Sequence, residues 1–218
     1  MPTDASRVAV YKNYPGKHLA KRLSAEQRRA SIITVAKRLF AHSGFHGVSI
    51  NEIVNEVGVS PSILYRHFES KEELYQSVLQ EFSATRESYV ETIVADDISF
   101  EQVLRGMTTV FVASIINHPA VLKMEMHSQL EGSEASQEFF LNRWKSFTDY
   151  IEFNLTELQS QGKIKKIDAS VAALMYQGII REVLLLKCMQ QTDRFKDMSV
   201  VKLVDEVITL FMKIIEPL

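Results

Sequence analysis

The sequence predicts an all-α protein in which an N-terminal three-helix head with a helix-turn-helix precedes a larger C-terminal helical bundle. Apolar residues recur at helical spacing through most of the chain, and about nine such stretches are present. Several of them follow a Ser that has Glu or Gln three residues later, a pattern that caps helix N-termini. We therefore divide the chain into a flexible basic arm (1–23), the head (24–70) and the body (71–218).

The first helix of the head begins after Ser24, and Gln27 completes its capping box. Its apolar stripe predicts one inward face, and Gly44 ends it. The residues of that stripe are Ile32, Ile33, Ala36, Leu39 and Phe40.

Residues 48–68 predict two short helices joined by a turn at Gly58. Ser49 and Glu52 form a capping box at the start of the first helix. A glycine at position 58 can adopt the left-handed conformation that follows a helix end. Ser60 caps the second helix and Pro61 occupies its first turn. Residues on the inward faces of the two helices are Ile50, Ile53, Val54, Val57, Ile63, Leu64 and Phe68.

The second of these helices is too short and too polar to belong to the core. Its remaining side chains face solvent or a partner, and the best partner is the major groove of DNA. A further capping box, at Ser70 and Glu73, begins the fourth helix. The alternative is an ordinary helical hairpin, but three short helices leading into a long fourth favour a DNA-binding head.

This stretch resembles the tetracycline-repressor (TetR) family of transcriptional regulators in one register over roughly residues 28–75. The matching residues are Ile32, Ile33, Ala36, Leu39, Phe40, Gly44, Phe45, Val48, Ser49, Ile50, Ile53, Val57, Gly58, Val59, Ser60, Leu64, Tyr65, His67, Phe68, Lys71, Glu72 and Leu74. The chain departs from the family at Ser62, where Gly is frequent, and at Ile63, where a small residue is common. We expect this pair to influence which bases are read.

The expected DNA contacts divide into reading and positioning. The reading residues are Ser60, Pro61, Ser62, Ile63 and, if it reaches a base rather than a phosphate, Arg66. Ser49 and Lys71, at helix N-termini, are expected to bind phosphate. The resemblance implies backbone contacts for Tyr65 and His67; a packing role of His67 against Phe68 is the alternative.

Charge supports the placement of DNA on the head. The net charge of the chain is −2. Residues 1–75 carry eleven Lys/Arg and seven Asp/Glu, a net charge of +4, and the remainder therefore carries −6. Much of the positive charge lies in the N-terminal arm and at the start of the first helix, at residues that include Lys12, Lys17, Lys21, Arg22, Arg28 and Arg29. This arm either stays a disordered tail or follows DNA phosphates and the minor groove.

The body should contain a long fourth helix from Lys71 to about Ala95, with Leu74, Val78, Phe82, Tyr89 and Ile93 inward. Further helices are expected from Ser99 to before Pro119 and over about 121–130, 134–161, 169–191 and 199–215. The last two are the most apolar, and their apolar face is wider than one core-facing stripe needs. The resemblance implies that these two helices form a homodimer through a four-helix interface.

The resemblance also implies a small-molecule pocket in the body, and few charges interrupt the candidate faces, which favours an apolar or amphipathic effector. The pocket candidates are Met107, Phe111, Phe140, Trp144, Phe147, Met175, Tyr176 and Ile179, which are alternatively plain core. Metal ligation by His118, Glu125 and His127 is not favoured by their spacing, so we expect surface roles, no metal and no cofactor.

Other classes find less support. The sequence has no catalytic triad order or phosphate-binding glycine loop, so we do not expect an enzyme. No signal peptide and no run near the roughly 18 apolar residues of a membrane span are present. The single cysteine, Cys188, suits a reducing cytoplasm. A non-specific architectural DNA protein and a relative that has lost DNA binding remain rivals.

These features together predict a cytoplasmic regulator that binds a near-palindromic double-stranded operator as a homodimer. Repression relieved by an effector is the expectation. A regulator without a small-molecule effector, or an activator, is the alternative.

Overall fold

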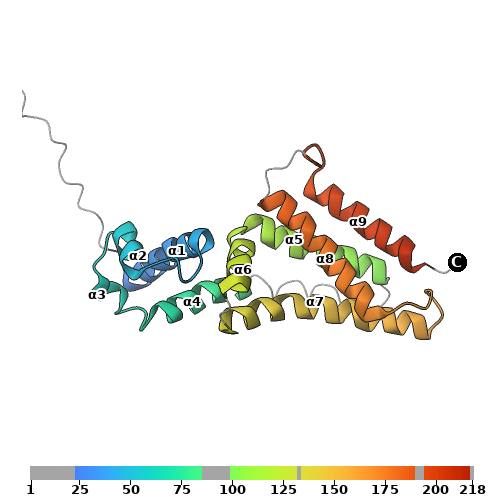
Figure 1. The fold of residues 1–218 in the computed structure, drawn as a ribbon, viewed down its shortest axis with the longest axis horizontal. Helices are drawn as coiled ribbons and strands as arrows, with labels where there is room; N and C mark the ends of the chain where they lie inside the picture. The colour runs from blue at the N-terminus through green and yellow to red at the C-terminus, as the bar shows by residue number, and fades with distance from the viewer. Residues whose placement is uncertain (1–22, 85–98, 132–133, 190–193, 217–218) are drawn as a thin grey trace, which may run out of the picture.

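The computed structural model describes residues 23–84, 99–131, 134–189 and 194–216, which form an elongated molecule with a head at one end and a body at the other (Figure 1). Within these ranges every regular element is a helix, as predicted. The head contains α1 (Ala25–Ser43), α2 (Ile50–Val57) and α3 (Pro61–Leu64), and α4 (Lys71–Ala84) leads away from it. The body contains α5 (Phe100–Asn117), α6 (Ala120–Glu131), α7 (Glu134–Ser160), α8 (Ala169–Cys188) and α9 (Val200–Ile215).

Serine caps begin most of these helices where the sequence predicts them. Reciprocal capping boxes are present at Ser24, Ser49 and Ser99. The box predicted at Ser70 is only half formed. The hydroxyl of Ser70 accepts from the backbone amide of Glu73 at 3.1 Å, but the Glu73 carboxylate accepts from the amide of Glu69, at 2.5 Å, instead of from Ser70.

The fourth helix carries its predicted inward residues, because Leu74, Val78 and Phe82 are all buried. Its described part ends at Ala84. The predicted extension to Ala95, with Tyr89 and Ile93, lies outside the described residues, as does the arm before residue 23.

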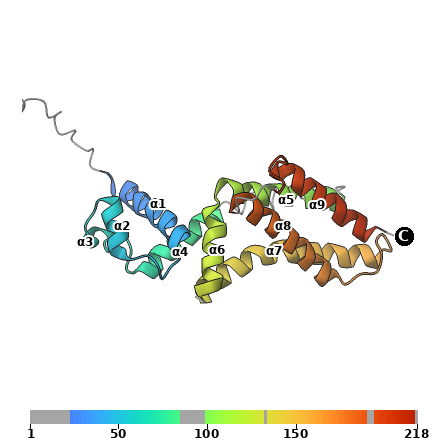
Figure 2. The same ribbon diagram turned by 45° about the horizontal axis from the view of Figure 1, so that its top comes forward.

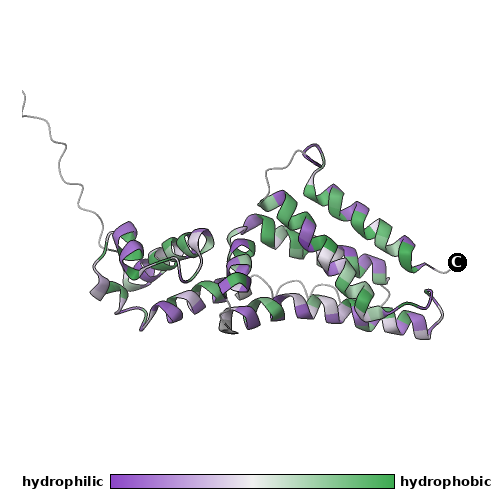
Figure 3. Ribbon diagram, viewed as in Figure 1, coloured by the Kyte–Doolittle hydropathy of each residue, from purple (hydrophilic) through white to green (hydrophobic). Residues whose placement is uncertain are grey.

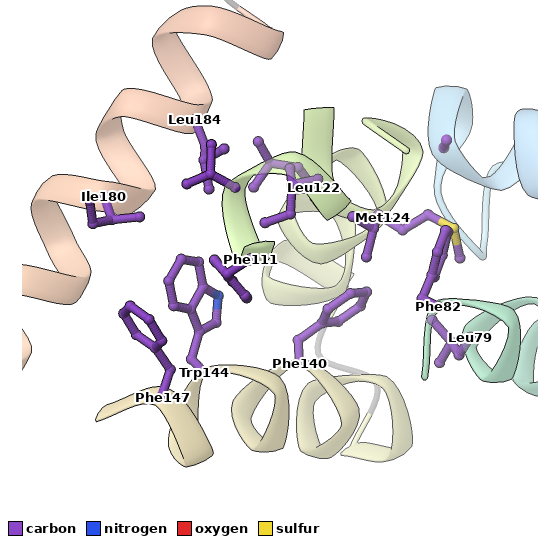
Figure 4. Close-up of a cluster of buried hydrophobic side chains, with 14 of the residues drawn as sticks. Leu79, Phe82, Phe111, Leu122, Met124, Phe140, Trp144, Phe147, Ile180 and Leu184 are labelled. Carbon is purple, nitrogen blue, oxygen red and sulfur yellow. The ribbon is translucent and has the colours of Figure 1, made fainter. Parts of the chain in front are cut away.

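The body is built around a row of stacked and edge-on rings contributed by α5, α7, α8 and α9. Figure 4 shows three of them, Phe111, Trp144 and Phe147. Phe111 lies 4.7 Å from Trp144 and 5.4 Å from Phe147, measured between ring centroids. The ring of Tyr176 continues the row, 5.9 Å from Phe147 and 4.7 Å from Phe211. The Tyr176 hydroxyl is paired with the Thr108 hydroxyl at 2.8 Å, so its burial leaves no orphaned polar group.

The two last helices pack on each other, and both are drawn mostly in the hydrophobic colour in Figure 3. Each leaves large apolar side chains exposed. The apolar residues of α8 divide between a buried stripe and an exposed surface. The buried stripe is Ala172, Ala173, Tyr176, Ile180, Val183 and Leu184. Large apolar residues exposed on α8 and α9 are Val171, Leu174, Ile179, Val201, Leu210 and Ile214.

By length and composition alone, α8 is the one helix of the described ranges that could cross a membrane, although Gln177, Arg181 and Glu182 interrupt its apolar residues. Core helices of globular proteins pass the same test. Here α8 packs against α7 on one side and α9 on another.

Helix α6 joins the head to the body, and Figure 2 shows it standing between α1 and α7. Its C-terminal residue Glu131 reaches the head, where its carboxylate accepts a hydrogen bond from the backbone amide of Phe45. The head is therefore connected to the body twice, by α4 packing on α7 and by α6 packing on α1.

Candidate nucleic-acid interface and effector cavity

The turn between α2 and α3 has the geometry predicted from Gly58. This residue is left-handed, with φ 74° and ψ 41°, and its amide and that of Val59 both donate to the carbonyl of Val54 at 2.9 Å. A side chain would meet no neighbouring atom at Gly58, so the positive φ alone is the reason for glycine. The turn fixes the direction in which α3 leaves α2.

The short helix α3 is held by two buried anchors and exposes the rest of its surface. Leu64 and Phe68 are almost completely buried. The predicted reading and positioning residues fall into two groups. Those exposed are Ser60, Pro61, Ser62, Tyr65 and Arg66, and those half-buried are Ile63 and His67. The His67 ring lies 6.5 Å from that of Phe68, so a packing contact accompanies any contact with DNA.

Ser60 differs from the other serines at helix starts. Its side chain caps no backbone amide of α3 in the described head. The hydroxyl instead pairs with that of Ser62 at 2.9 Å. Ser60 does occupy the predicted N-cap position of α3. Its side chain, however, does not make the capping hydrogen bond that was predicted. Two adjacent hydroxyls on the exposed face therefore remain available as donors and acceptors.

Ser49 and Lys71, the predicted phosphate ligands, already have partners within the head. The Ser49 hydroxyl accepts from the amide of Glu52 at 3.2 Å and donates to its carboxylate at 2.9 Å. Hydrogen bonds from the backbone and side chain of Ser49 lower the pKa of the Glu52 carboxyl. A negative charge therefore lies where phosphate was expected, and a phosphate contact at Ser49 stays a prediction.

The ammonium of Lys71 donates to the carbonyls of Phe45 and Val48, at 2.9 and 3.0 Å, and lies over the Phe45 ring. It therefore ties α4 to the connection between α1 and α2. An ammonium has three N–H donors, so one remains for a phosphate.

Arg29 lies in α1 and supports the head from within. Its guanidinium donates to Ser77 at 3.1 Å and lies 4.9 Å from the centre of the Phe68 ring. Because Phe68 anchors α3, this arginine helps to fix the recognition surface from behind. Ser24, which begins α1 ahead of Arg29, is the sequence signal for its helical position.

The head is also what known proteins share with this chain. Residues 32–78 match the family described as "Bacterial regulatory proteins, tetR family". The helix-turn-helix head of this chain is that of the TetR family of transcriptional regulators. This head is accordingly a DNA-binding one, and the relatives that share it are transcriptional regulators.

Individual relatives match different lengths of this chain. It is 40% identical to the transcriptional activator FasR of Mycolicibacterium smegmatis over 65 residues, which is 30% of each protein, so the match spans under a third of that relative. It is 26% identical to the transcriptional regulator UidR of Escherichia coli over 64% of this chain and 70% of UidR. A TetR-family regulator from Chloroflexus aurantiacus has a similar fold, with a TM-score of 0.72 at 15% identity over 90% of this chain and 96% of that one.

In the body, the predicted pocket residues do not lie around one cavity. Phe111, Phe147 and Tyr176 are packed into the ring row, and Met107 is buried beside it. Core packing accounts for these four. Met175 and Ile179 instead line an open groove of about 540 Å³ between α8 and α9.

Phe140 and Trp144 do line a cavity, of about 220 Å³, between α6, α7 and α8. The sequence missed its polar residues. The lining is Glu125, Ser128, Gln129, Gln137, Phe140, Leu141, Trp144, Gln177 and Arg181. The available sequence signal was Arg181, a cation in the middle of the largely apolar helix α8.

Glu125 is the main correction in this cavity, because the sequence assigned it to the surface and it is 3% exposed. Its carboxylate accepts from the indole N–H of Trp144 at 3.2 Å and pairs with Arg181 at the same distance. Burial raises the pKa of the Glu125 carboxyl, while Arg181, Trp144 and Arg143 oppose that shift. Among the described residues no group of three His, Cys, Asp or Glu could hold a metal ion.

Proposed function

We propose that this chain is a homodimeric regulator that binds a near-palindromic operator and responds to a small molecule in its body. The observation that carries the proposal is the exposed surface of α3, anchored by Leu64 and Phe68 and bearing the paired hydroxyls of Ser60 and Ser62. Such a surface fits base edges in the major groove, which present both donors and acceptors.

Two heads are needed, because a single small module buries little DNA surface. The large apolar side chains exposed on α8 and α9 support self-association, since exposed apolar patches mark interaction sites. A two-fold dimer through this face would present two α3 helices to half-sites about 34–36 Å apart, one turn of duplex.

Helix α6 supports a route from the cavity to the head. It contributes Glu125, Ser128 and Gln129 to the cavity, and Glu131 to the contact with Phe45. A ligand that changes the position of α6 would shift the heads between arrangements that fit or miss two half-sites. A hundredfold change in DNA affinity requires about 2.7 kcal/mol of coupling.

Repression is the simplest consequence, because a protein bound over a promoter excludes polymerase without any further contact surface. Activation is the second candidate, and the relative FasR, which is named an activator, favours it. Either role places the protein with DNA in the cytoplasm.

Selection of bound duplexes from a random-sequence library tests the proposal. We expect enrichment of a near-palindrome, protection of two half-sites in footprinting, and two chains per duplex in sedimentation. The selected site should outcompete random DNA by at least about a thousandfold. Recovery of no preferred sequence, or a single chain on a single half-site, would contradict it.

A further inference from the structure

The cavity between α6, α7 and α8 has an apolar wall and a charged end. Phe140, Leu141 and Trp144 of α7 form the wall. At the other end the carboxylate of Glu125 faces the guanidinium of Arg181 on α8. A cavity of this kind suits an amphipathic molecule, because apolar lining supplies affinity and a few polar groups fix orientation.

The donor capacity of Arg181 is only partly used. One terminal nitrogen, Nη2, donates to Gln129 at 3.0 Å and pairs with Glu125 at 3.2 Å. The Nε–H is buried and meets no acceptor among the described residues. A buried donor without an acceptor is unfavourable, so a ligand that brings an acceptor to this edge gains what the free protein lacks.

Glu125 leaves less room for a cationic ligand. Both of its oxygens already accept from the Trp144 indole, and one of them also pairs with Arg181. A cation would have to displace the guanidinium from a carboxylate that is already well supplied with donors. An anion can instead replace Glu125 at Arg181, and the raised pKa of Glu125 makes it easier for this side chain to become neutral.

We propose that this cavity binds a small carboxylic acid, whose carboxylate pairs with Arg181 in place of Glu125 and whose apolar part lies against Phe140, Leu141 and Trp144. Carboxylates match the planar fork of arginine and form charge-assisted hydrogen bonds with it. The cavity, at about 220 Å³, is smaller than typical ligand pockets of roughly 300–1,000 Å³. This favours compact aromatic or short-chain acids. This carboxylic acid would be the effector of the proposed switch. Binding in the cavity does not depend on the proposed function, but an effect of the ligand on operator affinity does.

Trp144 is the only tryptophan of the chain, so its fluorescence reports directly on the cavity. We would titrate the full chain with phenylacetate, with the neutral phenylacetamide and with the cationic phenethylamine. Phenylacetate should change the Trp144 signal saturably. The amide and the amine should bind at least about tenfold more weakly, since neither brings a carboxylate that can form an ion pair with Arg181.

Variants separate an anionic from a cationic ligand. Glu125→Gln removes the competing carboxylate and should tighten phenylacetate binding. Arg181→Gln should weaken it by about tenfold or more. Arg181→Gln leaves the buried Glu125 carboxylate without its cation and could unfold the protein. The double variant Glu125→Gln/Arg181→Gln is neutral at both positions and should also bind phenylacetate weakly. Lys145→Gln, an exposed cation beside Trp144 in sequence, is the matched control and should bind like the wild type.

Tighter binding of phenethylamine than of phenylacetate, with loss of binding in Glu125→Gln, would overturn the proposal. Absence of saturable binding by phenylacetate would do so as well. Operator binding is measured separately, so a failed cavity with intact DNA binding can be told apart from a failed regulator. Ligand binding that leaves operator affinity unchanged would support the carboxylate site and contradict the switch.

Discussion

The carboxylate of Glu131, at the end of α6, accepts a 2.9 Å hydrogen bond from the backbone amide of Phe45. The neighbouring residue Gly44 makes this contact possible. Its φ is +73° and its ψ is −178°, a combination that is essentially confined to glycine. A methyl group added to Gly44 would collide with the Glu131 carboxylate and press on His127. Local backbone geometry at the end of α1 is thereby coupled to the contact between head and body.

The variants Gly44→Ala and Glu131→Ala should therefore be non-additive. Gly44→Ala alone combines backbone strain with displacement of the carboxylate and should lower the free energy of unfolding by about 2–4 kcal/mol. In the Glu131→Ala background only the strain remains, so its cost should fall by about 1 kcal/mol. Urea unfolding of the four proteins in the double-mutant cycle measures this difference.

Glu138→Ala, which removes an exposed carboxylate from α7, is the control and should be additive with Gly44→Ala. Additivity of Gly44→Ala with Glu131→Ala would mean that the two residues do not share the contact at Phe45.

Ser49→Ala and Ser60→Ala should affect different properties of the protein. Ser49 caps α2 with a complete capping box, so its loss should lower the free energy of unfolding by about 1 kcal/mol. Ser60 caps nothing with its side chain, so its loss should cost less than about 0.5 kcal/mol. Operator affinity should respond in the opposite order, with Ser60→Ala weakening it by about 1 kcal/mol or more.

Thermal or urea unfolding and competition binding on the selected operator would be measured on the same two variants. A Ser60→Ala protein that binds the operator like the wild type would remove this hydroxyl from the reading surface.

The head was predictable because its determinants are local in sequence. Capping serines, a glycine that needs positive φ and alternating faces of short helices all act within one or two turns. Ser60 shows the limit of this reasoning. The sequence position identifies it as an N-cap residue, but it does not show that its hydroxyl pairs with Ser62 and not with a backbone amide.

The cavity was not predictable because it depends on which faces of three helices meet. Phe140 and Trp144 were identified as candidates, yet Phe111 and Phe147, with equally suitable side chains, are core. A buried Glu125 could not be inferred without Arg181, which lies 56 residues later in the sequence. Likewise the outward position of Leu174 follows from the packing of α8 against α7 and α9, and its periodicity alone did not reveal it.

Leu174→Glu should convert the protein into a monomer. Leu174 is 65% exposed on the apolar face of α8, so a charge there costs little in one chain but would be buried in a dimer through this face. Sedimentation should show loss of the dimer, and operator affinity should fall by about tenfold or more.

Phe153→Glu is the matched control, because Phe153 is similarly exposed, at 66%, but lies on α7. It should remain dimeric. A dimer that survives Leu174→Glu, or is lost in Phe153→Glu, would place the interface elsewhere.

Glu125 should give the stability of the protein a characteristic dependence on pH. Burial raises the pKa of this carboxyl above its ordinary value of 4.5, although Arg181 opposes the shift. The folded state therefore binds this proton more tightly than the unfolded chain does. The resulting stabilisation is complete below the ordinary pKa and is lost as pH rises through the raised one.

Glu125→Gln cannot titrate at this position and keeps an oxygen for the Trp144 indole. Its free energy of unfolding, compared with that of the wild type, should therefore improve as pH rises from about 4 to 7. Urea unfolding across this range measures the difference, and Glu138→Gln controls for the loss of an exposed carboxylate. If the free energy of unfolding of Glu125→Gln instead falls relative to that of the wild type as pH rises, Arg181 stabilises the charged carboxylate more than burial penalises it. In that case Glu125 would hold Arg181 too firmly for an incoming carboxylate to replace it.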